Sequence, residues 1–167
     1  MTVQLSPTLH TLGNTDLLAL RKIAFLCSRR SPESACRKAL AWAATAGRAG
    51  GCIVSGCQSA VEKDLFRALA TQCQPMIVVL ARGLRQPPEA EFAGLLAAGR
   101  LLLMTRYAAT VTHPCEEKCL QRNRLMMELS DEIVVGYAAP GGTLQRLCRE
   151  FETRKELIYL TGREGEP

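Results

Sequence analysis

Short apolar runs alternate with helix-like segments along this chain, and that alternation restricts the folds open to it. The runs have the continuous apolar character of strands buried on both faces, at residues 23–27, 52–54, 76–80, 101–104, 132–136 and 157–160. Segments with helical spacing or helix-start signals lie between them, at 33–46, 60–70, 87–98, 121–130 and 143–154. This order favours right-handed crossovers and a parallel sheet with helices on both faces.

The sequence therefore predicts an α/β fold, a single Rossmann-like domain over residues 23–160 with a mostly parallel six-stranded sheet. Residues 1–22 are expected to form an irregular lead-in, in which 16–20 are either a short helix or a segment packed on the sheet edge. Residues 161–167 are expected to be a polar, frayed tail. A length of 167 residues suits one domain.

Composition argues against a membrane partner and permits an anionic one. With 47% hydrophobic and 22% charged residues, and no apolar run near the ~18 residues of a membrane span, we expect a soluble protein without a membrane partner. The N-terminus lacks a basic-then-apolar signal pattern, which indicates a cytoplasmic location. The net charge of +5 permits an anionic ligand, whereas 5% aromatic residues argue against a long base-stacking platform.

The eight cysteines are interpreted mainly as reduced thiols, because five lie in or beside apolar segments and cytosolic disulfides are rare. His113, Cys115 and Cys119 form the one cluster with metal-like spacing. It lacks a fourth ligand and a paired CxxC, so no metal or other cofactor is predicted, and whether Cys115 and Cys119 bind metal stays open.

Polar and glycine residues gather where predicted strands end, and in an open parallel sheet the ligand crevice lies at the carboxyl ends of the strands. Arginine guanidinium groups and the backbone amides at helix starts both bind phosphate. Segment 121–124 is placed at the head of a helix, as such a site requires. The predicted phosphate-binding residues are Ser28, Arg29, Ser55, Gly56, Gln58, Arg122, Asn123, Arg124, Gly141, Gly142 and Thr143.

Known catalytic and nucleotide-binding signatures are absent. The chain contains neither GxGxxG nor GxxxxGK[ST], and His10 and His113 lie in irregular segments without a recognisable nucleophile elbow. Acidic candidates near the predicted crevice are Glu62, Asp64, Glu128 and Asp131. Glu62 falls in the first turn of its helix, where it favours the helix dipole, and Asp131 is placed at a helix end.

Arg122-Asn123-Arg124 followed by Leu129-Ser130-Asp131 resembles the Phe-Pro-x-Arg-Asn-Arg…Leu-Ser-Asp signature of the DNA-processing protein A family (DprA, also called Smf). Cys27-Ser28-Arg29 resembles that family's Gly-(Ser/Thr)-Arg, and Val54-Ser55-Gly56 its Val-Ser-Gly. The similarity covers about 23–160. Cys119-Leu120 replaces Phe-Pro, and Ala60-Val61-Glu62 stands where Gly-Ile-Asp is usual.

The resemblance implies a protein that binds single-stranded DNA through backbone phosphates in DNA processing and recombination. Arg29, Ser55, Gly56, Arg122 and Arg124 are the residues it assigns to that binding. A recombinase is the protein partner it implies. Oligomers are common for this architecture, so a homodimer is also expected.

A second resemblance, within the same superfamily, is to the LOG-type phosphoribohydrolases. Pro140-Gly141-Gly142-Thr143 resembles their Pro-Gly-Gly-x-Gly-Thr, which is followed by a catalytic Glu, and Gln145 falls about where that carboxylate belongs. An amide cannot act as a general acid or base, so the sequence favours a binding protein with no catalytic residue over an enzyme. A nucleotide-binding module or a LOG-like nucleoside-monophosphate phosphoribohydrolase remains the alternative.

Overall fold

The computed structural model describes residues 8–162, which form a seven-stranded sheet with helices on both faces. The strands are β1 (His10–Gly13), β2 (Lys22–Cys27), β3 (Cys52–Ser55), β4 (Met76–Leu80), β5 (Leu101–Thr105), β6 (Glu132–Tyr137) and β7 (Leu157–Tyr159). Their order is β1-β5-β4-β3-β2-β6-β7, and every pair is parallel except β1 with β5. The predicted Rossmann-like α/β class is confirmed, with one strand more than the predicted six.

The additional strand, β1, lies within the predicted lead-in. It pairs antiparallel with β5, from His10 opposite Thr105 to Gly13 opposite Leu102, and its side chains are mostly exposed. An exposed edge strand needs no continuous apolar run, which is why apolar patterning missed it. The segment after it is the short 3-10 helix η1 (Thr15–Ala19), which buries Leu17. The predicted tail, 161–167, lies mostly outside the described residues.

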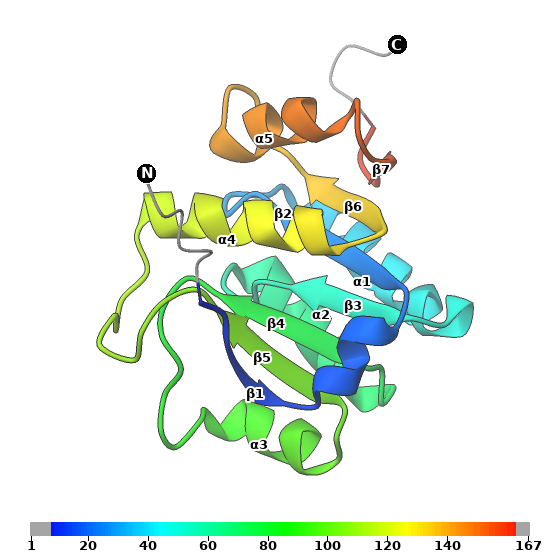
Figure 1. The fold of residues 1–167 in the computed structure, drawn as a ribbon. Helices are drawn as coiled ribbons and strands as arrows, with labels where there is room; N and C mark the ends of the chain where they lie inside the picture. Colours follow the sequence, from blue (N-terminus) through cyan, green and yellow to red (C-terminus); the bar gives the residue numbers. More distant parts are fainter. Residues whose placement is uncertain (1–7, 163–167) are drawn as a thin grey trace.

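The helices divide between the two faces of the sheet. Helices α1 (Glu33–Ala46), α2 (Ala60–Thr71) and α3 (Ala90–Ala97) contribute to the apolar core on one face, whereas α4 (Glu116–Leu129) and α5 (Thr143–Phe151) build the core on the other. In Figure 1, α4 crosses in front of the strands and the fainter α1 and α2 lie behind them. No helix in the described range 8–162 is long and apolar enough to cross a membrane.

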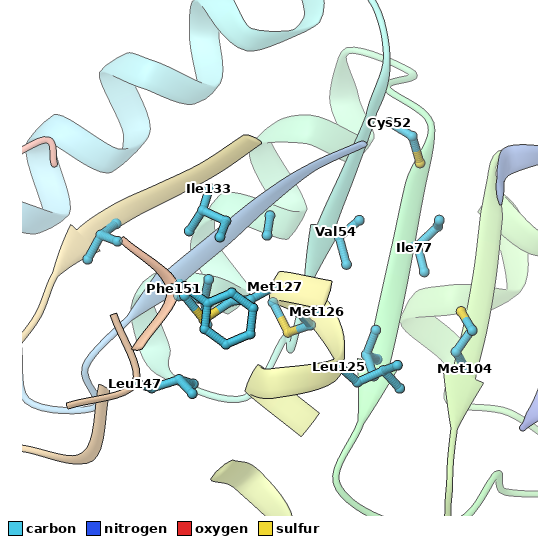
Figure 2. Close-up of a cluster of buried hydrophobic side chains, with 14 of the residues drawn as sticks. Cys52, Val54, Ile77, Met104, Leu125, Met126, Met127, Ile133, Leu147 and Phe151 are labelled. Atoms are coloured by element: carbon cyan, nitrogen blue, oxygen red, sulfur yellow. The ribbon is translucent and has the colours of Figure 1, made fainter. Parts of the chain in front are cut away.

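The core on the α4 and α5 face explains the continuous apolar runs in the strands. Figure 2 shows side chains of both helices packed with those of the strands; Leu125, Met126, Met127, Leu147 and Phe151 lie with Val54, Ile77 and Ile133. Alternate residues of the same strands, such as Ile53 and Val78, are buried in the core on the opposite face. Successive positions in the middle of a central strand are therefore apolar, and no alternation with polar residues is visible there.

Helix α4 begins at Glu116, five residues before the predicted start at 121. Cys115 has extended backbone as its N-cap, and Glu116 and Glu117 occupy the first turn, where acidic side chains stabilise a helix. Residues 121–124 therefore lie inside the helix, where backbone N–H groups donate to carbonyls of the preceding turn. The prediction that residues 121–124 begin the helix is therefore wrong, and this segment has side chains but no free backbone N–H groups to offer a ligand.

The opposite end of α4 is tied to the amino ends of the strands. The helix ends at Leu129, and the Asp131 carboxylate accepts a hydrogen bond of 2.8 Å from the Lys22 N–H. The Asp131 N–H donates in turn to the Lys22 carbonyl at 2.8 Å. Asp131 therefore follows the end of the helix, as predicted, but it lies at the edge of the sheet opposite the predicted crevice.

The strand order reverses at β2, and that reversal positions the crevice. From β2 the chain proceeds through β3 and β4 to β5, then returns to place β6 on the other side of β2. The loops after β2 and β6 consequently lead to opposite faces and leave a gap at the carboxyl ends. A register shift occurs beside Gly136, where a Cβ atom would lie 2.8 Å from the Phe25 ring, so only glycine fits without displacing that ring.

Candidate functional site

A cavity of about 550 Å³ opens at this switch point. The loops after β2, β3, β5 and β6 supply its walls, together with the first turns of α2 and α5 and the first two turns of α4. It is called the arginine cavity below. Predicted site residues that line it are Ser28, Arg29, Gln58, Arg122, Asn123, Gly142 and Thr143. Ser55, Gly56, Arg124 and Gly141 do not.

Arg122 is buried in the wall of the arginine cavity, with 6% of its surface exposed. Its guanidinium donates to neutral oxygens only: the Gly56 carbonyl at 3.2 Å, Gln58 Oε1 at 3.3 Å and Asn123 Oδ1 at 2.8 Å. Within residues 8–162, no carboxylate forms an ion pair with it. Burying an unpaired cation is costly, so this site favours an anion supplied from outside.

Gly56 lies directly behind the guanidinium rather than on the cavity wall. A Cβ atom at this position would overlap Nη1 of Arg122 and lie 2.5 Å from its Cζ, so glycine allows the close approach. The buried Ser55 hydroxyl accepts the Cys57 N–H at 3.3 Å. Ser55 and Gly56 therefore shape the loop that supports Arg122.

Glu62 is the one acidic candidate of the four that lines the cavity, and its carboxylate caps a helix. Its Oε2 accepts the N–H groups of Gln58 and Ser59, both at 2.9 Å, while Ser59 Oγ accepts the Glu62 N–H at 3.2 Å. This capping box begins α2 and confirms the predicted role in the first turn. Asp64 and Glu128 instead pair with Arg67 and Arg106.

The loop after β2 brings hydroxyl and cationic groups to the mouth of the cavity. Ser28 Oγ accepts the Ala139 N–H at 2.9 Å and thereby joins this loop to the one after β6. Arg29 and Arg30 are exposed and line the cavity, without an ion pair among the described residues. Arg30 was missed by sequence reasoning, although its position beside Arg29 could have identified it.

Three cysteines line the cavity, and the thiol of one of them, Cys27, is not activated as a nucleophile. Burial raises the pKa of the Cys27 thiol to about 11, which keeps it neutral at physiological pH. The Cys119 thiol donates to Gln58 Oε1 at 3.3 Å, and Cys115 lies at the start of α4. In the described part of the chain, no group of three or more His, Cys, Asp or Glu residues is arranged to hold a metal ion.

The glycines before α5 offer fewer free backbone N–H groups to a phosphate than the sequence suggested. The Gly141 N–H donates to Gln145 Oε1 at 2.9 Å, and the Gly142 N–H to the Ala139 carbonyl at 3.0 Å. Both amides are therefore engaged in the turn. Gly142 and Thr143 still line the arginine cavity at the positive end of α5.

Arg124 points away from Arg122, because two residues correspond to about 200° around a helix. Its guanidinium forms a 2.8 Å ion pair with Glu150 of α5, and this hydrogen bond raises the pKa of Arg124 and lowers that of Glu150. The pair joins the two helices on this face. The structure thus separates the two arginines of the Arg-Asn-Arg segment.

The sequence profile of one family, DNA recombination-mediator protein A, matches residues 2–166, almost the whole chain. The chain belongs to this family. The predicted resemblance to DNA-processing protein A is thereby confirmed. No curated protein matches the sequence.

Solved structures of the family share the fold. DNA processing protein A from Helicobacter pylori, described for its single-stranded DNA binding mode, has a TM-score of 0.76 at 22% identity, covering 98% of this chain and 77% of its own. The Streptococcus pneumoniae protein has a TM-score of 0.75 at 20% identity, covering 95% of this chain. The present chain spans only 56% of the length of that S. pneumoniae chain.

The likeness extends more weakly to molybdenum cofactor carrier proteins. The protein from Rippkaea orientalis has a TM-score of 0.56 at 13% identity, covering 83% of this chain and 75% of its own. The carrier from Chlamydomonas reinhardtii has a TM-score of 0.52 at 12% identity, with the same coverage. Identities this low establish a common fold and nothing about ligands.

Proposed function

We propose that the arginine cavity binds single-stranded DNA through its backbone phosphates. The observation that carries the proposal is Arg122, a buried cation held against the cavity wall by neutral oxygens alone. A phosphate would supply the missing negative charge, and the guanidinium geometry suits its oxygens. Family membership and the single-stranded DNA binding of the H. pylori relative support DNA as the source of that phosphate.

The number of cations at the cavity sets the expected salt dependence. Arg29, Arg30 and Arg122 line it, so about three phosphates would be neutralised. Affinity for a single strand should then fall with salt with a logarithmic slope of about −2. Fluorescence anisotropy of a labelled oligothymidine across a salt series measures that slope, and a slope near zero would contradict phosphate binding.

Substitution of the two arginines tests the site directly. Arg29→Ala and Arg122→Ala should each weaken oligothymidine binding about tenfold, whereas Arg48→Ala should leave it unchanged. Arg48 is an exposed residue of η2 (Gly47–Ala49) that precedes β3, at the opposite end of the strands, and its loss changes the net charge equally. Thermal unfolding shows whether each variant is folded. Arg122→Lys keeps the positive charge and so separates the effect of charge from that of the guanidinium geometry. Unchanged oligothymidine affinity in both Arg29→Ala and Arg122→Ala would contradict the proposal.

A small nucleotide is the second candidate ligand, because a volume of about 550 Å³ lies in the range of small-molecule sites. We propose binding without hydrolysis, since Gln145 stands where a LOG-type carboxylate belongs and its Oε1 is bonded to Gly141. Thermal shifts with mononucleotides, cyclic nucleotides and a pyrimidine oligonucleotide distinguish the ligands. Free base released from a nucleoside monophosphate would contradict the absence of catalysis.

The proposal extends to DNA processing and recombination, with a recombinase as partner and a homodimer as the assembly. The family's description as a recombination mediator supports both the role in recombination and the recombinase partner. The homodimer is expected from the architecture alone. Sedimentation analysis measures the assembly state of the chain without DNA.

A further inference from the structure

We propose that a second cavity, next to the arginine cavity, holds a nucleobase of the same bound strand; this inference rests on the proposed function. The second cavity has a volume of about 440 Å³, and its lining includes Tyr137, Tyr159, Gln145, Arg149 and Glu152. It is called the tyrosine cavity below. It lies where β6 and β7 end, beside α5.

A single loop separates the two cavities. Ala138 lines the tyrosine cavity and Ala139, the next residue, lines the arginine cavity. Their Cα atoms are separated by about 3.8 Å, the fixed spacing across a trans peptide. The loop is held in place by Ser28, whose N–H donates to the Tyr137 carbonyl at 2.8 Å and whose Oγ accepts the Ala139 N–H at 2.9 Å. The two cavities are therefore neighbours across this loop, and the proposed strand would cross it with phosphate in the arginine cavity and a base in the tyrosine cavity.

The lining of the tyrosine cavity suits a base better than a second phosphate. Tyr137 and Tyr159 supply partly buried rings, and the exposed Arg149 supplies a planar guanidinium; both kinds of group stack on bases. Gln145 Oε1 accepts the Gly141 N–H, so its amide NH₂ keeps donors for a base edge. The Glu152 carboxylate, which accepts the Tyr159 hydroxyl at 2.9 Å, would repel a phosphate.

The tertiary structure thereby supplies aromatic groups that the sequence did not place near the phosphate site. The chain has three tyrosines, and two of them, Tyr137 and Tyr159, meet at this one cavity. Cys119-Leu120 stands where the signature that this segment resembles has Phe-Pro, so α4 contributes no ring at that point. The two rings at the tyrosine cavity come from β6 and β7 instead.

The test compares oligothymidine with an abasic strand of the same length, which has the same phosphates but no bases. By fluorescence anisotropy, the unsubstituted protein should bind oligothymidine about tenfold more tightly than the abasic strand. Tyr137→Leu and Arg149→Ala should each remove most of that difference while leaving abasic binding unchanged. Tyr107→Leu, which replaces the third tyrosine, should preserve it, because Tyr107 lines neither cavity.

The outcomes separate the two proposals. Equal binding of both strands by the unsubstituted protein would overturn the base site and leave phosphate binding intact. A parallel loss of affinity for both strands in Tyr137→Leu and Arg149→Ala would also overturn it, since a base contact cannot affect an abasic strand. Absence of binding to either strand would instead refute the proposed function, and the base site with it.

Discussion

Burial of Arg122 costs free energy in folding, and the same burial prepares its charge for binding an anion. Its guanidinium is buried without an acidic partner, which is unfavourable in the free protein. The same arrangement leaves its charge available to a phosphate. Gly56, 66 positions earlier in the chain, makes this possible by leaving room for the guanidinium against the backbone.

Gly56→Ala should weaken DNA binding with little effect on stability. The backbone of Gly56 lies outside the left-handed region, so alanine can adopt it, and the added Cβ would meet the end of a flexible side chain. We expect the displaced Arg122 to lower oligothymidine affinity about tenfold, with a change in the free energy of unfolding below about 1 kcal/mol. Anisotropy and urea unfolding measure the two quantities.

Gly94→Ala is the matched control for this substitution. Gly94 lies in α3, and a Cβ atom there meets nothing within 4 Å. Alanine in a helix is favoured over glycine by about 0.5–1 kcal/mol, so this variant should be slightly more stable and bind DNA normally. Wild-type affinity in Gly56→Ala would show that the position of the Arg122 guanidinium is unimportant for binding.

At the scale of elements, α4 connects the two ends of the sheet. Its second turn presents Arg122 and Asn123 to the arginine cavity, while the residue after its C-cap, Asp131, bonds to the first residue of β2. One part of the Arg-Asn-Arg…Leu-Ser-Asp signature therefore lines the arginine cavity, and the other part attaches the helix to the sheet. Arg124, between them, joins α4 to α5 through Glu150.

Asp131→Ala should destabilise the protein without affecting DNA binding, and the destabilisation should depend on pH. The Lys22 N–H, the largest cause, lowers the pKa of the Asp131 carboxyl below its ordinary value. The stabilisation is thus fully present above the unfolded pKa, about 3.9, and is lost as pH falls through the lower folded value. Because the side chain is 57% exposed, we expect only about 0.5–1 kcal/mol at pH 7.

Thermal unfolding of both proteins from pH 7 to pH 2.5 measures this effect. The difference between wild type and Asp131→Ala should be constant down to about pH 4 and decrease below it. Asp64→Ala removes an exposed acid that pairs with Arg67 within α2, and it controls for the change in net charge. A difference that persists undiminished to pH 2.5 would argue against a role for the ionised carboxylate.

At the scale of the whole molecule, stability should be highest in the middle of the sheet and lowest at its edges. All residues of β3 and β4 are buried, and each strand pairs with a neighbour on both sides. β7 has one neighbour in the sheet and partly exposed side chains, and β1 is similar. Amides of central strands open only with most of the fold, whereas edge strands open locally.

Hydrogen–deuterium exchange measured by mass spectrometry should reproduce this order. Peptides that cover β3 and β4 should exchange at least about a hundredfold more slowly than peptides that cover β1 and β7. Oligothymidine should slow exchange in the loops after β2 and β6 and leave the central strands unchanged. Equal protection of β7 and β3 would show that β7 opens only with the core.

The sequence by itself determined the α/β class, five of the helices and the buried parallel strands, because each depends on short-range periodicity and on the helix-start signals nearby. It also contained the Arg-Asn-Arg…Leu-Ser-Asp motif, from which family membership could be expected. Helix α4 was placed five residues late, since its true start depends on an N-cap that apolar spacing does not reveal. β1 was missed because an exposed edge strand has little apolar pattern.

Only the tertiary structure decided which parts of the motif face the arginine cavity. Helical geometry directs Arg122 into the arginine cavity and Arg124 toward Glu150, and strand order brings Gly56 against Arg122. The tyrosine cavity likewise joins residues from β6, α5 and β7. Such contacts depend on how distant segments pack around the reversal at β2, and no local pattern in the chain encodes the direction in which a single side chain will point.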